Sequence, residues 1–308
     1  MDITLRQVKY FVAVAETGKL VTAAKLVNIS PSSITEAVKE LESITGVSLI
    51  TRHRRGVNLT FEGFRFLQHC RDILSSVTAA EYDLKNSKSH LSGELTIGVT
   101  FTIAGYFLAS LMSRFNRAFP LMKTKFMEYN RPDIERLILE EKMDLAILLV
   151  SNVNNDQLNS KLLVSSPRKL WMSMNHPFFQ KKNISLEDVS QVPYIQLLVD
   201  EADTSHMKYW HKYNASPQVL FNTESVEAVR SMVAIGSGVT ILSDMVYRPW
   251  SLEGKRIESR ELVNQIPSMD VGLIWNKKIP PTPCAEAFID FCLMEYSPGR
   301  PLSNHPLP

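Results

Sequence analysis

Residues 20–46 read LVTAAKLVNISPSSITEAVKELESITG, and this stretch predicts two helices joined by a short turn. The first helix spans about residues 20–27 and contains two adjacent alanines, which are small enough to let another helix cross closely. Ser30 then offers a hydroxyl that can cap the second helix, and Pro31 stands at the first helical position, where its missing N–H costs nothing. Gly46 marks the end of the second helix.

An amphipathic helix is also predicted before this stretch, where Thr4 and Gln7 are spaced as a capping box. Two crossing helices with a short turn between them are typical of a helix-turn-helix, whose second helix presents its N-terminal residues to the DNA major groove. Short hydroxyls at that end can reach base edges or phosphates, and a glutamate can accept a hydrogen bond from a cytosine amino group. The exposed candidates are Ser32, Ser33, Thr35 and Glu36.

A hairpin with a basic turn is predicted directly after the second helix. Residues 47–50 and 57–59 are expected to form its strands. The basic cluster Arg52, His53, Arg54 and Arg55 between them is expected to form a turn that binds phosphates. A solvated charged loop is the alternative, but a position next to the helix favours a wing. We therefore expect a winged helix-turn-helix over residues 1–59 whose DNA contacts come from Ser30, Pro31, Ser32, Ser33, Thr35, Glu36, Lys39, Arg52, His53, Arg54 and Arg55.

This segment resembles the DNA-binding domain of the LysR-type transcriptional regulators. The shared residues are Leu5-Arg6-Gln7 with Tyr10-Phe11, Ala23-Ala24-Lys25-Leu26, Leu41-Glu42, Gly46-Val47 with Leu49, Arg52, Arg55-Gly56, and Leu59-Thr60 with Gly63. The chain departs from the family where Ser30-Pro31-Ser32 replaces the common Ser-Gln-Pro and where Glu36 replaces a frequent arginine. The second helix is therefore net acidic, and we expect phosphate attraction mostly from the wing and from N–H groups at the helix start.

A long helix is predicted over residues 60–90, with a 3,4 repeat of residues that is typical of a coiled coil. The repeat consists of Leu67, Cys70, Leu74, Val77, Glu81 and Leu84. The family resemblance implies a homodimer through this helix, and a homotetramer is usual for such regulators; a dimer would engage two DNA half-sites together. The alternative is that this face packs on the chain's own core.

Alternating strands and helices in residues 91–308 predict an α/β domain of two similar lobes. The first lobe spans about residues 91–164 and 270–296, and the second about 165–269. The predicted fold class is α/β: a winged helix-turn-helix, a linker helix and a Rossmann-like pair of lobes. This pair resembles the effector-binding domain of LysR-type regulators, which is similar to periplasmic solute-binding proteins. The resemblance implies a small-molecule effector between the lobes, at strand ends.

The effector site has candidates on both lobes. Thr100, Phe101 and Thr102 follow the first strand, where hydroxyls and helix-start N–H groups can hold a carboxylate. By position, Arg131, Leu149, Leu198 and Val199 match pocket-facing sites of the family, although strand core or a surface turn would also suit them. Because three of these matches are apolar, we expect a largely apolar effector with one acidic group that meets Arg131.

Composition and motifs favour a cytoplasmic regulator over an enzyme. The net charge is only +2, no secretory signal begins the chain, and no apolar run approaches a membrane span. Gly236-Ser237-Gly238 lacks the spacing of a phosphate loop or nucleophile elbow, and His206 and His211 are wrongly spaced for a metal. We therefore expect no catalytic site, cofactor or metal.

Two other functions stay open at this level. Cys70, Cys284 and Cys292 are too few and too scattered for a disulfide framework or a zinc cluster, yet cysteine pairing could make the chain a redox-sensing regulator. Cys284 and Cys292 would lie about 12 Å apart along one helix, which is too far for a disulfide unless the helix unwinds. The lobes alone would also permit a solute-binding protein without a DNA-binding role.

Overall fold

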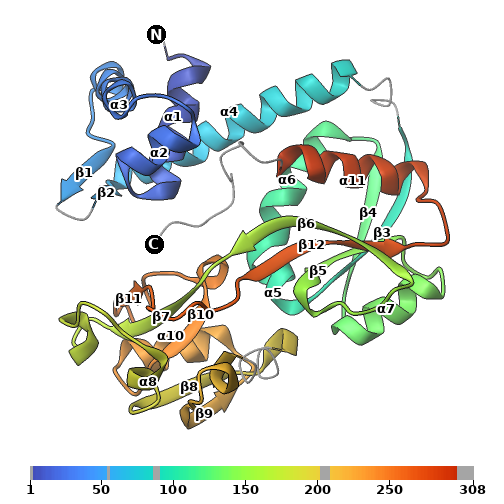
Figure 1. The fold of residues 1–308 in the computed structure, drawn as a ribbon. Coiled ribbons are helices and arrows are strands. Elements are labelled where there is room, and N and C mark those ends of the chain that lie inside the picture. The colour runs from blue at the N-terminus through green and yellow to red at the C-terminus, as the bar shows by residue number, and fades with distance from the viewer. Residues whose placement is uncertain (1–2, 54–55, 86–90, 202–208, 297–308) are drawn as a thin grey trace. The chain divides into compact units, whose positions relative to one another are not determined.

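The computed structural model describes residues 3–53, 56–85, 91–201 and 209–296. The chain divides into two compact units (Figure 1). Unit 1 holds Met1–Ser92, Ser110–Met122 and Ala287–Leu307, and unit 2 holds Gly93–Ala109 and Lys123–Glu286. The two lobes of the α/β domain thus fall mainly in unit 2, and the helical N-terminal domain falls in unit 1.

Three helices begin unit 1: α1 (Leu5–Thr17), α2 (Leu20–Leu26) and α3 (Pro31–Thr45). The expected capping box forms, because the Gln7 backbone N–H donates to Thr4 Oγ1 at 3.2 Å and the Thr4 backbone N–H donates to Gln7 Oε1 at 2.9 Å. Ser30 caps α3 by accepting a hydrogen bond from the Ser33 backbone N–H at 3.1 Å. Gly46 ends α3 with φ 71°, a backbone angle that favours glycine.

The wing consists of β1 (Ile50–His53) and β2 (Gly56–Leu59), paired antiparallel. The prediction of a strand over residues 47–50 is wrong by about three residues. The backbone N–H groups of Leu49 and Ile50 donate to Glu42 Oε1 at 2.8 and 3.2 Å, so the backbone at the start of β1 is bonded to a side chain. Arg52 and His53 consequently lie in β1 and not in the turn, and Arg54 and Arg55 lie outside the described residues.

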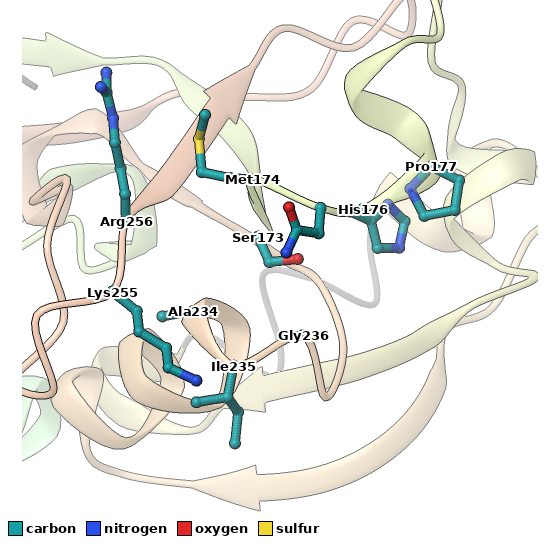
Figure 2. Close-up of a pocket in the computed structure, with 10 residues that line it drawn as sticks. Ser173, Met174, His176, Pro177, Ala234, Ile235, Gly236, Lys255 and Arg256 are labelled. Atoms are coloured by element: carbon teal, nitrogen blue, oxygen red, sulfur yellow. The ribbon is translucent and has the colours of Figure 1, made fainter.

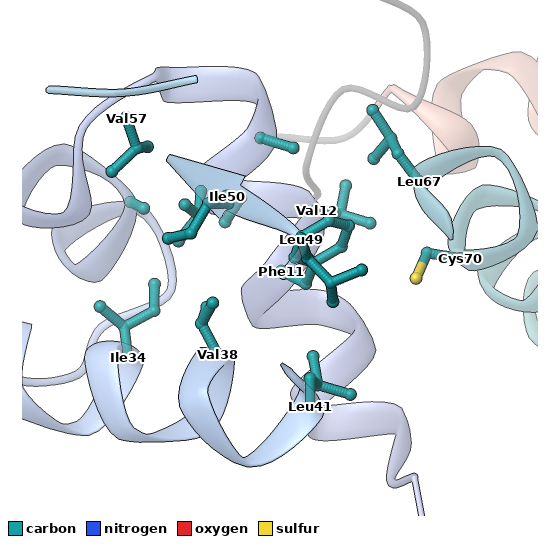
Figure 3. Close-up of a cluster of buried hydrophobic side chains, with 14 of the residues drawn as sticks. Phe11, Val12, Ile34, Val38, Leu41, Leu49, Ile50, Val57, Leu67 and Cys70 are labelled. Carbon is teal, nitrogen blue, oxygen red and sulfur yellow. The ribbon is translucent and has the colours of Figure 1, made fainter. Parts of the chain in front are cut away.

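The core of the N-terminal domain includes the start of α4 (Phe61–Lys85) (Figure 3). Leu67 and Cys70 are fully buried in this core beside residues of α1, α3 and β1, and Leu74 is packed against it. These residues begin the stripe that the sequence assigned to dimerisation. That assignment is wrong for Leu67 and Cys70, because their side chains already bury against their own domain.

Unit 2 contains the sheet of the first lobe, in the order β4-β3-β5-β12-β6. Strands β3 and β5 are parallel, whereas β12 is antiparallel to both β5 and β6. The sequence missed β6, a strand with exposed polar positions, and it did not predict that β12 reverses direction. The strands are β3 (Gly93–Val99), β4 (Met122–Glu128), β5 (Leu145–Leu149), β6 (Leu158–Ser166) and β12 (Met269–Asn276).

Helices alternate with these strands along the chain. α5 (Phe101–Ile103) follows β3 at once and continues into a π-helical turn, η1 (Ala104–Leu108), and α6 (Ala109–Ala118). α7 (Arg131–Leu139) packs on the sheet through Ile134 and Ile138, which contact Ala146 and Leu148 in one buried cluster. α11 (Pro283–Glu295) ends the described chain.

The second lobe has a three-stranded antiparallel sheet, ordered β10-β7-β11, and a parallel pair, β8 and β9, which a single bridge between Tyr194 and Val239 joins to it. Only Pro167 separates β6 from β7 where the chain crosses between lobes. The helix expected over residues 206–213 falls partly outside the described residues, and residues 209–212 are helical. The elements are β7 (Arg168–Ser173), α8 (Leu186–Val189), β8 (Pro193–Leu197), β9 (Gln218–Thr223), α10 (Val226–Ala234), β10 (Thr240–Ser243) and β11 (Ile257–Arg260).

Short 3-10 turns complete the chain: η2 (Val150–Asn152), η3 (Pro177–Phe179), η4 (Val199–Glu201) and η5 (Asp244–Val246). Within the described ranges, none of the helices has the length and apolar character that a membrane span requires.

Candidate functional site

The exposed surface at the start of α3 is rich in hydroxyl groups. Ser30 Oγ lies 2.7 Å from Ser32 Oγ and 2.8 Å from Ser33 Oγ, and all three side chains are exposed. Thr35 is half-buried, and its hydroxyl donates to the Pro31 carbonyl oxygen at 2.7 Å. The proton of Thr35 is thereby used inside the helix, and its oxygen is left to accept a hydrogen bond from a base or a side chain.

The acidic residues of α3 are not equivalent. Glu40 accepts a hydrogen bond from Gln7 Nε2 at 2.8 Å, and Glu42 accepts from the backbone before β1. Both carboxylates therefore hold the domain together. Glu36 is exposed on the outer face, as is Lys39, so Glu36 is the acidic group of α3 that remains available to read a base.

The wing is tied to the end of α1. The Val57 backbone N–H donates to the Gly18 carbonyl oxygen at 2.9 Å, and a Cβ at Gly56 would lie 2.2 Å from that same oxygen. A glycine is required at position 56, which also has φ 150°. Arg52 and His53 are exposed on β1, and His53 Nε2 lies 3.3 Å from Asn58 Oδ1. The wing thus presents the cationic side chain of Arg52, with His53 beside it, from a fixed backbone.

A cavity of about 200 Å³ lies between the two lobes of unit 2. Of the residues expected at the effector site, Thr100, Arg131, Leu149 and Leu198 line this cavity, whereas Phe101, Thr102 and Val199 do not. Val199 is packed against a core cluster of the second lobe. The lining residues that the sequence missed are Asn130, Pro132, Leu148, Asn152 and Asp200.

The polar side chains at this cavity differ in whether the chain itself supplies their partners. Thr100 is only 3% exposed, and its hydroxyl has no hydrogen-bond partner among the described residues. The guanidinium of Arg131 forms an ion pair with the carboxylate of Glu135 one helical turn away. Asp200 Oδ2 accepts a hydrogen bond from the Thr102 backbone N–H at 2.7 Å, so a carboxylate of the chain occupies a donor that the sequence assigned to the ligand.

A sequence signal exists for one of the missed residues and not for another. Asn130 precedes Arg131-Pro132 and caps α7, since its side-chain oxygen accepts from the Asp133 backbone N–H at 2.9 Å. An asparagine before a proline at a helix start is a recognisable capping pattern. Asp200 has no local signal, because its partner lies 98 residues earlier in the chain.

A larger cavity, of about 460 Å³, lies entirely in the second lobe (Figure 2). Its polar residues include Ser173, His176, Lys255 and Arg256. One side is lined by Ala234, at the end of α10, and by Gly236 just after it. Lys255 and Arg256 are exposed. None of the residues proposed from the sequence lines this cavity. The smaller cavity is the better candidate because residues of both lobes line it and because the buried Thr100 hydroxyl beside it has no partner in the described part of the chain.

The cysteines give no support to redox sensing. Cys70, Cys284 and Cys292 are all free and buried. Burial raises the pKa of the Cys70 thiol to about 12 and also raises the pKa of the other two, which disfavours the reactive thiolate. Across the described residues, no group of three or more His, Cys, Asp or Glu side chains could hold a metal ion.

Two family models match separate parts of the chain. The family model for the bacterial regulatory helix-turn-helix protein, lysR family, matches residues 5–64, and the model for the LysR substrate binding domain matches residues 88–297. The HTH-type transcriptional regulator CysB of Burkholderia cenocepacia is 28% identical over 254 residues, which cover 80% of this chain and 79% of CysB.

Solved structures show the same fold. HinK, a LysR family transcriptional regulator from Pseudomonas aeruginosa, is 26% identical with a TM-score of 0.61, covering 94% of this chain and 97% of HinK. The effector binding domain of QuiR, solved in complex with shikimate, has a TM-score of 0.57 at 20% identity, covering 67% of this chain and 97% of that domain. The N-terminal match is to a DNA-binding family, which leaves a solute-binding protein without a DNA-binding role unsupported. The chain belongs to the LysR family and is a DNA-binding transcription regulator with an effector-binding domain.

Proposed function

We propose that α3 and the wing divide the work of DNA recognition. The observation that carries this is the separation of two exposed surfaces: hydroxyls and Glu36 at the start of α3, and Arg52 and His53 on β1. Cations on a wing attract phosphates of any sequence, whereas side chains at the start of a recognition helix meet base edges in the major groove. The wing then contributes binding affinity for DNA of any sequence, and α3 contributes sequence specificity.

Gel-shift titrations of the full chain with a specific duplex and a random duplex test this division. Arg52→Ala and Arg54→Ala should weaken binding to both duplexes by similar factors and reduce its salt dependence. Thr35→Ala and Glu36→Ala should change the ratio between the two duplexes. Lys212→Ala, a change of charge in the second lobe, is the control. Equal losses on both duplexes for all four variants would contradict the proposal.

We also propose that a small-molecule effector occupies the cavity between the lobes and modulates this DNA binding. Support comes from the Thr100 hydroxyl, which is buried beside the cavity without a described partner, and from lining residues on both lobes. A ligand there contacts Leu149 of the first lobe and Leu198 of the second. It would therefore affect how the two lobes close on each other. An acidic group on the effector would have to compete with Glu135 for Arg131.

The proposed assembly is a homodimer through α4, with a homotetramer as the larger form. Support comes from Ile73 of α4, a large apolar side chain that is 40% exposed on the same helix as the predicted stripe. Such a dimer places two winged domains on two half-sites. The proposed partner is promoter or operator DNA, and the proposed location of the protein is therefore the cytoplasm.

A further inference from the structure

The cation that lines the cavity between the lobes already has an internal counter-ion. Arg131 is the one cationic residue among the described lining residues, and its guanidinium pairs with the carboxylate of Glu135. The other carboxylate oxygen of Glu135 accepts a hydrogen bond from Asn155 Nδ2 at 3.3 Å, and the Glu135 side chain is 12% exposed. This network keeps the carboxylate at Arg131 and balances the charge that an acidic ligand would seek.

Asp200 fills the second place where an acidic ligand could bind. Its Oδ2 accepts from the Thr102 backbone N–H at 2.7 Å, and its own carbonyl oxygen accepts from Asn152 Nδ2 at 3.4 Å. The residue adopts φ 51°, a left-handed angle that aspartate tolerates better than most side chains. Two contacts with the first lobe therefore hold this second-lobe carboxylate against the cavity.

Two further polar groups of the cavity, on Thr100 and Asp200, can accept a hydrogen bond from a ligand. The hydroxyl oxygen of Thr100 has no described partner, and no described residue donates to Asp200 Oδ1. The rest of the lining is mainly apolar, with Leu148, Leu149 and Leu198. Two oxygen acceptors above an apolar wall would meet an N–H group attached to a hydrocarbon skeleton.

We propose that this cavity selects a small, largely apolar molecule that carries a nitrogen donor group and no net negative charge. The inference rests on the proposed function, since it concerns the same effector cavity. The N–H group donates to Asp200 and Thr100, and the hydrocarbon part contacts the leucines. An anion would face the carboxylates of Asp200 and Glu135 against a single guanidinium, and repulsion between like charges is stronger where water is excluded.

Benzoate, benzamide and benzamidine form a matched set of probes for this inference. They share one ring and nearly one shape but carry a negative charge, no charge and a positive charge at neutral pH. We would titrate each into the full-length protein by calorimetry. Benzamidine and benzamide should bind at least about tenfold more tightly than benzoate.

Asp200→Asn is the decisive variant, because it keeps the shape and an oxygen for the Thr102 N–H but removes the charge. It should remove most of the preference for benzamidine over benzoate. Asp156→Asn makes the same change of charge at an exposed residue that does not line the cavity, and should leave the preference unchanged. Tighter binding of benzoate to the wild-type protein, or an unchanged preference in Asp200→Asn, overturns the charge selection and leaves the cavity as the effector site.

Thr100→Val tests the cavity itself. The valine side chain has nearly the volume of threonine but no hydroxyl, so circular dichroism should show an unchanged fold while benzamide and benzamidine bind several-fold more weakly. Binding of none of the three probes to any of the proteins, or equal binding with and without the Thr100 hydroxyl, overturns both the inference and the proposed effector site. The two failures are therefore distinguishable.

Discussion

Glu16 of α1 and Arg71 of α4 lie beside each other in a buried position. Arg71 Nη2 lies 3.7 Å from Glu16 Oε1, and their side chains are 13% and 6% exposed. Burial raises the pKa of Glu16 to about 8, despite the nearby guanidinium, and lowers the pKa of Arg71. Since the pKa of Glu16 is above its ordinary value of 4.5, its contribution to the free energy of unfolding is fully present below about pH 4.5 and is lost as pH rises through about 8.

Glu16→Gln should remove this pH dependence. We expect the wild-type protein to lose stability relative to the variant between about pH 5 and pH 9, because the folded core must accept the charge of Glu16 over that range. Thermal unfolding followed by circular dichroism at several pH values measures the difference. Glu62→Gln, at an exposed glutamate of α4, should follow the wild-type curve. Parallel curves for wild type and Glu16→Gln would refute the assignment.

Single residues could be predicted where their partners are close in sequence. The caps at Thr4 and Ser30 were predictable, because each side chain bonds within its own first helical turn. Asp200 was not, since it bonds to the backbone of Thr102, and only the folded lobes bring the two together. The role that the sequence gave to Thr102 N–H, holding a ligand carboxylate, therefore missed a carboxylate supplied by the chain.

The junction of the wing with α4 depends on one glycine in a helix. A Cβ at Gly63 would lie 1.9 Å from the Leu49 carbonyl oxygen, and this oxygen also accepts from the Thr60 backbone N–H at 3.1 Å. Thr60 Oγ1 in turn accepts from the Gly63 backbone N–H at 2.9 Å. The start of α4 is thus in direct contact with the backbone that leads into β1.

Gly63→Ala should destabilise the N-terminal domain by about 1–3 kcal/mol, because the added methyl group has to displace backbone. Gly105→Ala is the matched control in a second helical segment, where a Cβ would meet nothing within 4 Å. Urea unfolding of both full-length variants, followed by circular dichroism, makes the comparison. A smaller loss for Gly63→Ala than for Gly105→Ala would show that the backbone there yields easily.

Elements were predictable where a periodic apolar pattern was flanked by clear caps, as in α3 and α7. β6 was missed because its sequence, LNSKLLVSS, alternates poorly and presents polar residues, and its partner β12 comes more than 100 residues later. The start of β1 was misplaced because Glu42 bonds to backbone that an alternating pattern would otherwise assign to a strand.

Assembly is the question at the scale of the whole molecule. If two chains pair through α4, Ile73→Glu should place a charge in the contact and shift the protein from dimer toward monomer in sedimentation velocity. It should also lower the affinity for a two-half-site operator far more than for a single half-site, since each winged domain is intact. Gln68→Glu, at an exposed position of the same helix, is the control. Unchanged sedimentation of Ile73→Glu would place the contact elsewhere.

The division of the chain into a DNA-binding and an effector-binding part could be read from the sequence, because each part carries its own pattern and its own family likeness. What the apolar stripe of α4 packs against could not be read from the sequence. A 3,4 repeat marks an apolar stripe without saying what covers it, and Leu67 and Cys70 are covered by their own domain.

The contact between Gly63 and Leu49 has a consequence for how DNA is addressed. Because α4 begins against the backbone that leads into the wing, we expect the wing, the recognition helix and the first turns of α4 to move together. A rotation of α4 leaves the reading surface unchanged and alters only its orientation. If two chains pair as proposed, two such bodies would measure distance and phase along DNA, which has about 10–10.5 base pairs per turn. We expect control of this regulator to act on the spacing between half-sites more than on the bases within them.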